Sequence, residues 1–231
     1  MSTFIKKQYE YTLMRSERRT MAIYVRGGRV EVRAPLRMPE RDIDRFVAAK
    51  AGWIADKLAE SIERAERREA FSLDYGDSVI LRGAAYPIRA QAGTRAGFDG
   101  GAFYLPPGLE PEQIRQVCVR IYRGLAKNYL PGRVALYAER MGVKPLAVRI
   151  NGAKTRWGSC SAKRSVNFSW RLIMAADPLI DYVVVHELAH LTELNHSARF
   201  WAIVARVSPG YAALRKELRA LQVTLSLSLC K

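Results

Sequence analysis

Hydrophobic and polar residues alternate in short runs along the first third of the chain, which is typical of strands buried on one face. We predict strands at residues 9–14, 20–25 and 29–34. The sequence Arg-Gly-Gly at 26–28 separates the last two runs, and glycines in so short a connection favour a tight hairpin. The chain is therefore expected to begin with strands that include a hairpin.

Between residues 39 and 70 the spacing of apolar residues changes to three and four, which places them on one face of a helix. We predict one long helix over this stretch. The strand pattern returns at 71–105, interrupted by glycine-containing turns, and Pro-Pro-Gly at 106–108 is the best linker candidate in the sequence. We therefore predict two domains, a β-rich domain with one long helix at 1–105 and a second domain at 106–231.

Helical spacing dominates the second half of the chain. A long helix is expected from Pro111 to Met141, bent near Pro131 and ended by Gly142. Two strands follow at 146–150 and 166–170. Three further helices are expected, at 177–194, 198–207 and 211–222. Asp177 is the expected N-cap of the first, and Ser197 carries the N-cap signal of the second. The expected fold class is α+β, with a β-rich N-terminal region and a helical C-terminal region that carries a β-hairpin.

Composition and charge narrow the functional class. The chain has 231 residues, 49% of them hydrophobic, with 38 Lys and Arg against 22 Asp and Glu, a net charge of +16. These values indicate a folded, basic protein with an anionic substrate or partner. No apolar run approaches the ~18 residues of a membrane span, and the N-terminus lacks a secretory signal pattern. We therefore expect a cytoplasmic location and no membrane association.

The cysteines do not form a metal-binding pattern. Cys118, Cys160 and Cys230 are odd in number and never stand in a C-x-x-C arrangement. This argues against both a disulfide framework and a cysteine-based zinc site. Cys160 precedes the histidine cluster and could approach a metal there, but a small buried residue is the better interpretation.

All three histidines of the chain lie within eleven residues, in the segment VVVHELAHLTELNH. His186 and His190 stand at positions i and i+4 of a predicted helix, so one metal ion could contact both. Glu187 is rotated by about 100° from His186, so it does not join the ligand set but can reach a metal-bound water. Asn195 tolerates a left-handed conformation and could end the helix, which would let His196 return as the third ligand.

Three imidazoles and one water form the open tetrahedral site of a catalytic zinc ion. The alternative is that these are ordinary half-buried histidines. The apolar run before His186 makes this alternative unfavourable, because burying three histidines and a carboxylate without an ion is costly. We predict one zinc ion per chain, and zinc is favoured over iron or manganese because the ligand set is all imidazole.

The segments VVVHELAHL and NHSARFW, with KTRWGSCS and VNFSWRLI before them, resemble the YgjP-like family of zinc-dependent metallohydrolases, which is related to SprT- and WLM-type zincin-like peptidases. The resemblance extends across most of the chain and implies a zincin-like C-terminal domain. It also implies that His186, His190 and His196 bind zinc and that Glu187 is catalytic. The histidine spacing is shared with metzincins, but Glu193 stands where metzincins have glycine, which argues against membership of that group.

Residues 140–176 contain eight Lys and Arg residues and no Asp or Glu. Such a segment just before a metal site favours an anionic substrate. Lys154, Arg156 and Trp157 are the predicted substrate-binding residues, on a hairpin expected at 154–161, and Trp157 could stack on a base or pack under the metal helix. The alternative interpretation is a solvated basic surface with a core tryptophan. The Glu193 side chain could hydrogen-bond to one of the histidine ligands, or it could face solvent.

Three functions remain open at this point. The first is a zinc-dependent metallopeptidase with Glu187 as general base. The second, implied by the family resemblance, is a nucleoside triphosphate pyrophosphatase that acts on UTP with the same metal site. The third is a nucleic-acid-associated module with structural zinc, in line with the net charge of +16, although no known nucleic-acid-binding motif is present. The sequence does not indicate the oligomeric state.

Overall fold

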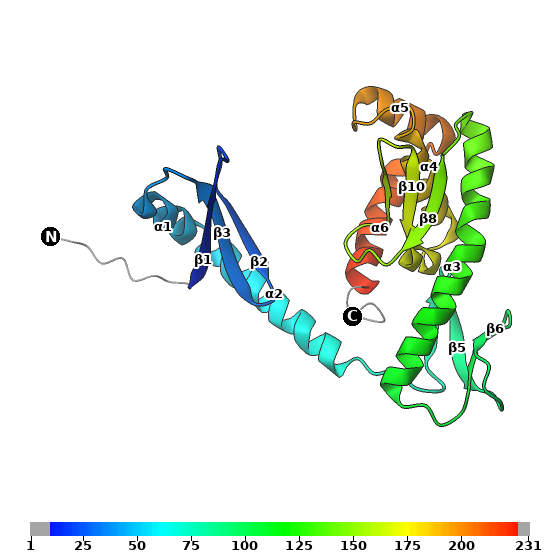
Figure 1. Cartoon of the computed structure of the whole chain (residues 1–231). Coiled ribbons are helices and arrows are strands. Elements are labelled where there is room, and N and C mark those ends of the chain that lie inside the picture. Colours follow the sequence, from blue (N-terminus) through cyan, green and yellow to red (C-terminus); the bar gives the residue numbers. More distant parts are fainter. Residues whose placement is uncertain (1–9, 226–231) are drawn as a thin grey trace. The chain divides into compact units, whose positions relative to one another are not determined.

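A computed structural model describes residues 10–225, without the side chains of residues 64, 67–69, 223 and 225. The chain divides into two compact units, Met1–Phe71 and Ser72–Lys231 (Figure 1). Within the described residues it contains three small sheets and six α-helices, which confirms the predicted α+β class. None of the helices in this part of the chain is both long and apolar enough to cross a membrane. Cys230 and the first residue of the strand predicted at 9–14 lie outside the described residues.

The first unit contains a three-stranded sheet. Strands β1 (Tyr11–Ser16), β2 (Ala22–Arg26) and β3 (Arg29–Pro35) are arranged in the order β1-β3-β2, with β1 parallel and β2 antiparallel to β3. The predicted hairpin is confirmed. Gly27 and Gly28 have φ values of +54° and +72°. A two-residue hairpin turn requires this left-handed backbone at both positions, and glycine adopts it without steric cost.

Two helices, α1 (Glu40–Ala49) and α2 (Ala51–Ala70), replace the single helix predicted from residue 39 to residue 70. The prediction was wrong at Lys50, whose φ and ψ of −107° and 13° interrupt the helical geometry. Spacing alone cannot reveal this break, because the apolar pattern continues across it. Ile43 of α1 and Ile54 of α2 are completely buried, and the two helices cover the sheet through them.

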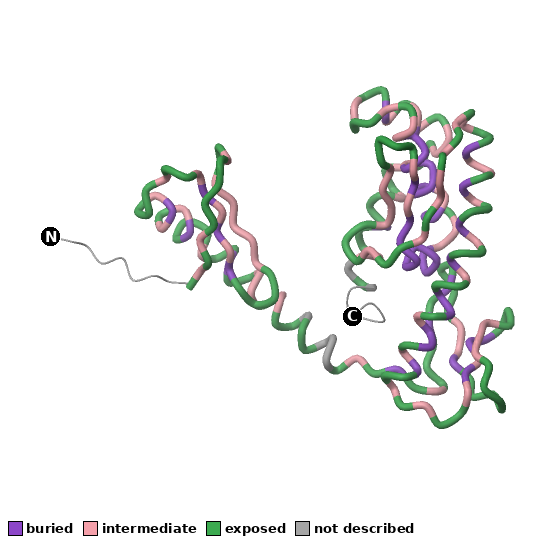
Figure 2. Tube along the Cα trace, viewed as in Figure 1, coloured by how far each residue is buried: buried purple, intermediate pink, exposed green. Residues whose placement is uncertain are grey.

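The second unit begins with a four-stranded sheet. Its strands are β4 (Ser78–Leu81), β5 (Ala84–Ala90), β6 (Gly97–Phe98) and β7 (Phe103–Leu105), arranged in the order β4-β5-β7-β6. This confirms the strand pattern predicted for residues 71–105. In the second unit many of the buried residues lie along the helices at Pro111–Met141 and Asp177–Ala189 (Figure 2).

This sheet packs against the C-terminal part of the chain. The backbone N–H of Arg82 donates to the carbonyl oxygen of Ile173 at 2.9 Å, and the Tyr122 hydroxyl donates to the carbonyl oxygen of Ile80 at 2.6 Å. The compact units consequently divide after Phe71, whereas the sequence placed the boundary after residue 105. The Pro-Pro-Gly segment at 106–108 is a turn within the second unit, since long-range hydrogen bonds join the strands before it to the elements after it.

Helix α3 (Pro111–Met141) has the predicted limits. Glu110 and Gln113 form a capping box at its start, and Gly142 ends it with a left-handed φ of +65°. The helix runs through Pro131 without interruption, and the bend expected near this residue stays a prediction. Proline has no backbone N–H, so one intrahelical hydrogen bond is absent at this position.

The third sheet stands next to the histidines. Strands β8 (Ala147–Asn151), β9 (Gly158–Cys160) and β10 (Ser165–Ser169) have the order β8-β10-β9, with β8 parallel and β9 antiparallel to β10. The hairpin therefore joins β9 to β10, and the predicted hairpin at 154–161 was misplaced. Residues 152–157 form the loop before β9, and β9 is an edge strand of its sheet.

A short 3₁₀ helix, η1 (Trp170–Met174), leads to α4 (Asp177–Ala189), α5 (Ala198–Val207) and α6 (Tyr211–Leu225). Helix α5 has its predicted limits, and the Ser197 hydroxyl accepts a hydrogen bond from the N–H of Phe200, which confirms the predicted cap. Helix α4 ends five residues before the predicted position 194. The N–H groups of residues 191 and 192 bond to carbonyls three residues back, which tightens the turn and ends the helix.

Helices α3 and α4 are joined by polar clamps. Arg133 of α3 forms a two-pronged ion pair with Asp181 of α4, at 2.5 and 2.7 Å. Asp177 receives hydrogen bonds from Arg82 and from the Tyr129 hydroxyl. Asp177 was predicted to cap α4 but is its first residue, because its carboxylate turns to these two donors instead of to the backbone. The clamps hold the helix that carries His186 and ends at His190.

Candidate metal centre

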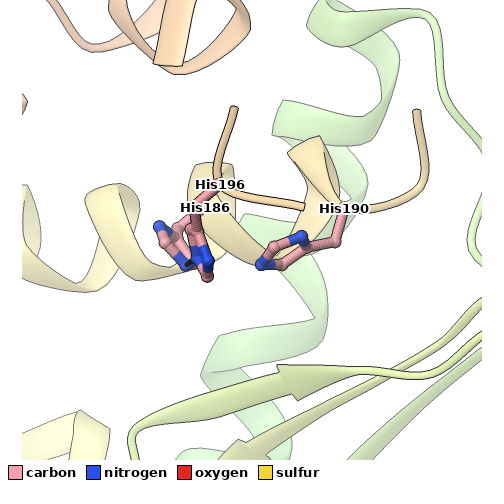
Figure 3. Close-up of side chains that lie close together, drawn as sticks. All are labelled: His186, His190 and His196. Atoms are coloured by element: carbon pink, nitrogen blue, oxygen red, sulfur yellow. Dashed lines mark hydrogen bonds between the residues drawn. The ribbon is translucent and has the colours of Figure 1, made fainter. Parts of the chain in front are cut away.

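The three histidines form one cluster (Figure 3). His186 lies on α4, His190 is the residue that caps its end, and His196 follows on the loop before α5. One ring nitrogen from each residue lies within 4.8 Å of the others, and the Nε2 atoms of His186 and His196 are 3.0 Å apart. The structure thus brings together the three residues that the sequence predicted as ligands.

The hydrogen bonding of the rings fits a metal ion. The Nδ1 atom of His190 lies 3.1 Å from the carbonyl oxygen of Glu193, and an Nδ1–H donated there leaves Nε2 free to bind a metal. Glu193 therefore contacts His190, one of the predicted ligands, through its backbone carbonyl, whereas the sequence analysis considered a contact from its side chain. The buried Nδ1 atom of His186 has no hydrogen-bond partner within residues 10–225.

Burial also sets the protonation state that metal binding needs. It lowers the pKa of His186 to about 3 and also lowers the pKa of His190, with neighbouring histidines adding to both effects. Both rings are therefore neutral at neutral pH, and only a neutral imidazole has the lone pair that a metal ion requires. The donor set and its charge state fit a divalent cation.

Aromatic rings form a wall behind the cluster. The Phe200 ring is completely buried, and its centroid lies 4.5 Å from that of His190, 4.7 Å from that of His196 and 4.9 Å from that of His186. Trp201 stands 5.7 Å from His196 and stacks on Tyr211. The contact of Phe200 and Trp201 with the histidines was not predicted from the sequence. The Ser197 cap could have indicated this contact, because it fixes where α5 begins and so places Phe200 and Trp201 close after His196.

Glu187 lies on α4 and is buried, with 6% of its surface exposed. Burial raises the pKa of its carboxyl to about 8, and the positive charge of Arg156 opposes this rise. Strand β9 passes very close to the carboxylate. An added Cβ at Gly158 would lie 2.6 Å from the Glu187 Cγ and 2.7 Å from its Oε1, so glycine is required at this contact.

Two neighbouring cavities open at this place. The larger has a volume of about 370 Å³ and the smaller about 240 Å³. Both are lined by Arg156, Gly158, His186 and Glu187. The larger is completed by Ser159, Cys160, His190, Leu194 and His196, and the smaller by Trp157, Tyr182, Val183 and Leu218.

The three predicted substrate-binding residues differ in their position relative to the two cavities. Arg156 lines both cavities and Trp157 lines the smaller one, whereas Lys154 lines neither. Lys154 is exposed, and its carbonyl oxygen accepts a hydrogen bond from Gln222 of α6 at 3.0 Å. Cys160 is half-buried on the wall of the larger cavity, where burial and then the charge of Glu187 raise the pKa of its thiol.

An open cavity that holds a histidine triad and a buried glutamate is the arrangement of a metal-dependent hydrolase. The chain belongs to the YgjP-like family, because the family model for the YgjP-like metallopeptidase domain matches residues 19–221. This match confirms the resemblance found in the sequence and places the domain in a class of metal-dependent hydrolases.

Two known proteins are similar to parts of the chain. The UTP pyrophosphatase of Escherichia coli (strain K12) is 29% identical over 103 residues, which are 44% of this chain and 62% of that protein. The match thus spans less than two thirds of that relative. The crystal structure of the metallopeptidase zymogen of Pyrococcus abyssi abylysin aligns with 39% of this chain and 92% of its own, at 23% identity and a TM-score of 0.37.

Proposed function

We propose that the protein is a zinc-dependent hydrolase that cleaves peptide bonds, with Glu187 as general base. The observation that carries this proposal is the common cavity of Glu187 and the histidine triad. A structural zinc site is closed by four protein ligands, whereas three histidines beside an open cavity leave one position for water or substrate. This argues for catalysis over the alternative of a structural metal in a nucleic-acid-associated module.

His186, His190 and His196 would hold the ion, and zinc suits a set of three neutral imidazoles. Zinc in such a site lowers the pKa of water and polarises the substrate oxygen. Glu187 accepts a proton from the attacking water on its carboxylate and delivers it to the leaving nitrogen. Burial raises the pKa of the Glu187 carboxyl, and a bound cation would oppose this rise and favour the carboxylate form that accepts the proton.

The edge strand β9 supports a peptide as substrate. It pairs with β10 on one side, and its residues Gly158, Ser159 and Cys160 line the cavity that contains the histidines. The free edge of a strand offers backbone N–H and C=O groups that an extended peptide can join. A peptide bound there would run along the cavity in which Glu187 lies.

A nucleoside triphosphate is the second candidate substrate. Arg156 lines both cavities, and a guanidinium beside a hydrolytic site binds phosphate well. The similar Escherichia coli protein is named UTP pyrophosphatase, which favours UTP among the nucleotides. In this reaction Glu187 would again take the proton of the attacking water, and Trp157 would stand near the base or ribose.

A parallel assay separates the two substrates. Purified, zinc-loaded protein is incubated with fluorescein-labelled casein, with a mixed peptide library and with each of the four ribonucleoside triphosphates. Release of peptide fragments supports the first proposal, and release of pyrophosphate from UTP supports the second. The Glu187→Gln protein is the matched control, since it excludes contaminating hydrolases. If the wild-type and control proteins show the same rates on every substrate, both proposals are wrong.

A further inference from the structure

The loop at 152–157 is held almost entirely through its carbonyl oxygens. Arg171 donates from Nη1 to the carbonyl oxygens of Gly152 and Ala153, at 3.0 and 3.4 Å. The Ser169 hydroxyl donates to Ala153 at 2.7 Å, and Gln222 donates to the carbonyl oxygen of Lys154. These donors come from β10, η1 and α6, so three separate elements fix one side of the loop.

Arg171 is an unusual donor for this purpose. Only 7% of its surface is exposed. Among the side chains that the structure describes, its buried Nε has no hydrogen-bond partner and no carboxylate forms an ion pair with it. Its guanidinium lies over the Trp170 ring, 4.4 Å from the centroid. Burying a charge without an opposite charge is costly, so the carbonyl contacts to the loop are its main compensation.

The other end of the same loop reaches the metal centre. The N–H of Ser169 donates to the carbonyl oxygen of Trp157 at 2.8 Å, and the next residue, Gly158, lies against Glu187. Between the two fixed ends stands Arg156, which lines both cavities. The carbonyl oxygens of Ala153 and Trp157, on either side of Arg156, accept hydrogen bonds from the buried residues Ser169 and Arg171, and these bonds restrict the backbone that carries the Arg156 side chain.

We propose that Arg171 is a positioning residue that acts through Arg156: it fixes the loop at 152–157 so that Arg156 is held at the cavity of Glu187 to bind an anionic group of the substrate. This inference rests on the substrate role proposed for Arg156. It also explains why the buried donor is arginine, since one guanidinium reaches two successive carbonyls while it stacks on Trp170.

The first test needs no substrate and no metal. The loop contains two trypsin sites, after Lys154 and after Arg156, and Arg95 provides a comparison site in the loop between β5 and β6. In the full-length Arg171→Met protein, cleavage at the two loop sites should accelerate at least about tenfold relative to Arg95. Arg133→Met is the matched control, because it removes a partly buried arginine from the α3–α4 clamp. Equal acceleration at all three sites, or none, overturns the proposal.

The second test is a double-mutant cycle on kcat/KM, with UTP and labelled casein as substrates. Arg156→Ala and Arg171→Met should each lower kcat/KM by about tenfold, and the double variant should lose no more than about twofold beyond Arg156→Ala. Arg171→Lys should recover part of the loss. If the two losses multiply, Arg171 acts on general stability and the proposal is wrong. If the wild type hydrolyses neither substrate, the proposed function fails, and the trypsin measurement still decides whether Arg171 holds the loop.

Discussion

Gly158 of β9 lies so close to the Glu187 side chain that no space remains for a side chain at position 158. An added Cβ would lie between 2.6 and 2.9 Å from three atoms of Glu187. Both residues line the two cavities, so the same contact sets the position of the proposed base. Glycine at this place has a functional consequence, and it can be tested directly.

Gly158→Ala should lower activity and stability together. The new methyl group must displace Glu187 or β9, and overpacking of this kind costs about 1–3 kcal/mol. A displaced base should lower kcat by about tenfold or more. Thermal unfolding and turnover measure the two effects. Gly132→Ala on the exposed side of α3 is the control, since nothing lies within 4 Å of its added Cβ and alanine there should stabilise the helix by about 0.5–1 kcal/mol. Equal behaviour of the two variants would contradict the close contact.

One divalent metal ion should bind per chain, and it should be lost when a ligand is removed. Elemental analysis after zinc loading is expected to give one zinc ion in the wild-type protein and none in His190→Ala. Zinc should also raise the thermal midpoint of the wild type, because a ligand of the native state stabilises it. The midpoint of His190→Ala should not respond. Equal zinc contents in the two proteins would show that the triad is not the binding site.

Glu187→Gln separates metal binding from chemistry. The amide has the shape of the carboxyl but cannot accept the proton, so turnover should fall by about 10²-fold or more while the zinc content remains one per chain. The measurement combines steady-state kinetics with elemental analysis on the same preparation. Turnover near the wild-type level would exclude Glu187 as the general base.

The sequence predicted those turns and helix ends whose conformation depends only on residues close to one another in the chain. The hairpin glycines at 27 and 28, the Gly142 end of α3 and the Ser197 cap of α5 all follow from backbone conformations that particular residues favour. The histidine triad belongs to the same group, because two of its members are one helical turn apart. Such features need only a few adjacent residues.

Long-range contacts could not be predicted in this way. Strands β4 to β7 belong to the second unit because hydrogen bonds such as that from Arg82 to Ile173 join them to elements after residue 105, and no local pattern encodes these bonds. The buried Arg171 was counted only among the basic residues of its segment, because its contacts with carbonyl oxygens depend on the folded loop. The contact between Gly158 and Glu187 joins a strand to a helix, and no pattern of neighbouring residues predicts it.

Asp177 should make stability depend on pH in the acidic range. The hydrogen bond from Arg82, with that from Tyr129, holds the pKa of Asp177 below its ordinary value of about 3.9. Its contribution is therefore fully present above the ordinary pKa and is lost as the pH falls through the lowered value. The effect should be small, because the pair is partly exposed. Urea unfolding between pH 2 and pH 6 should show a shallower acid loss for Asp177→Asn, and Arg82→Met should give the same change. An unaltered acid slope in both variants would refute this link.

Arg156 and Lys154 should differ in their effects on an anionic substrate. Arg156 lines both cavities, whereas Lys154 lines neither and is exposed. Arg156→Ala removes a charge-assisted contact of ~1.5–3 kcal/mol, which corresponds to roughly ten- to a hundredfold in kcat/KM. Lys154→Ala should change kcat/KM by less than about threefold, because an exposed charge outside the cavity is worth under about 1 kcal/mol.

Salt provides the second readout of this comparison. The loss caused by Arg156→Ala should shrink as ionic strength rises, because Arg156 is itself exposed and salt screens its charge. Steady-state kinetics with UTP and with labelled casein, between about 0.05 and 0.5 M salt, measure this change. The outcome also separates the substrates, since the triphosphate of UTP should depend on Arg156 more strongly than a peptide bound along β9. Equal, small losses for Arg156→Ala and Lys154→Ala on both substrates would mean that Arg156 is a surface charge, and the nucleotide proposal would lose its structural support.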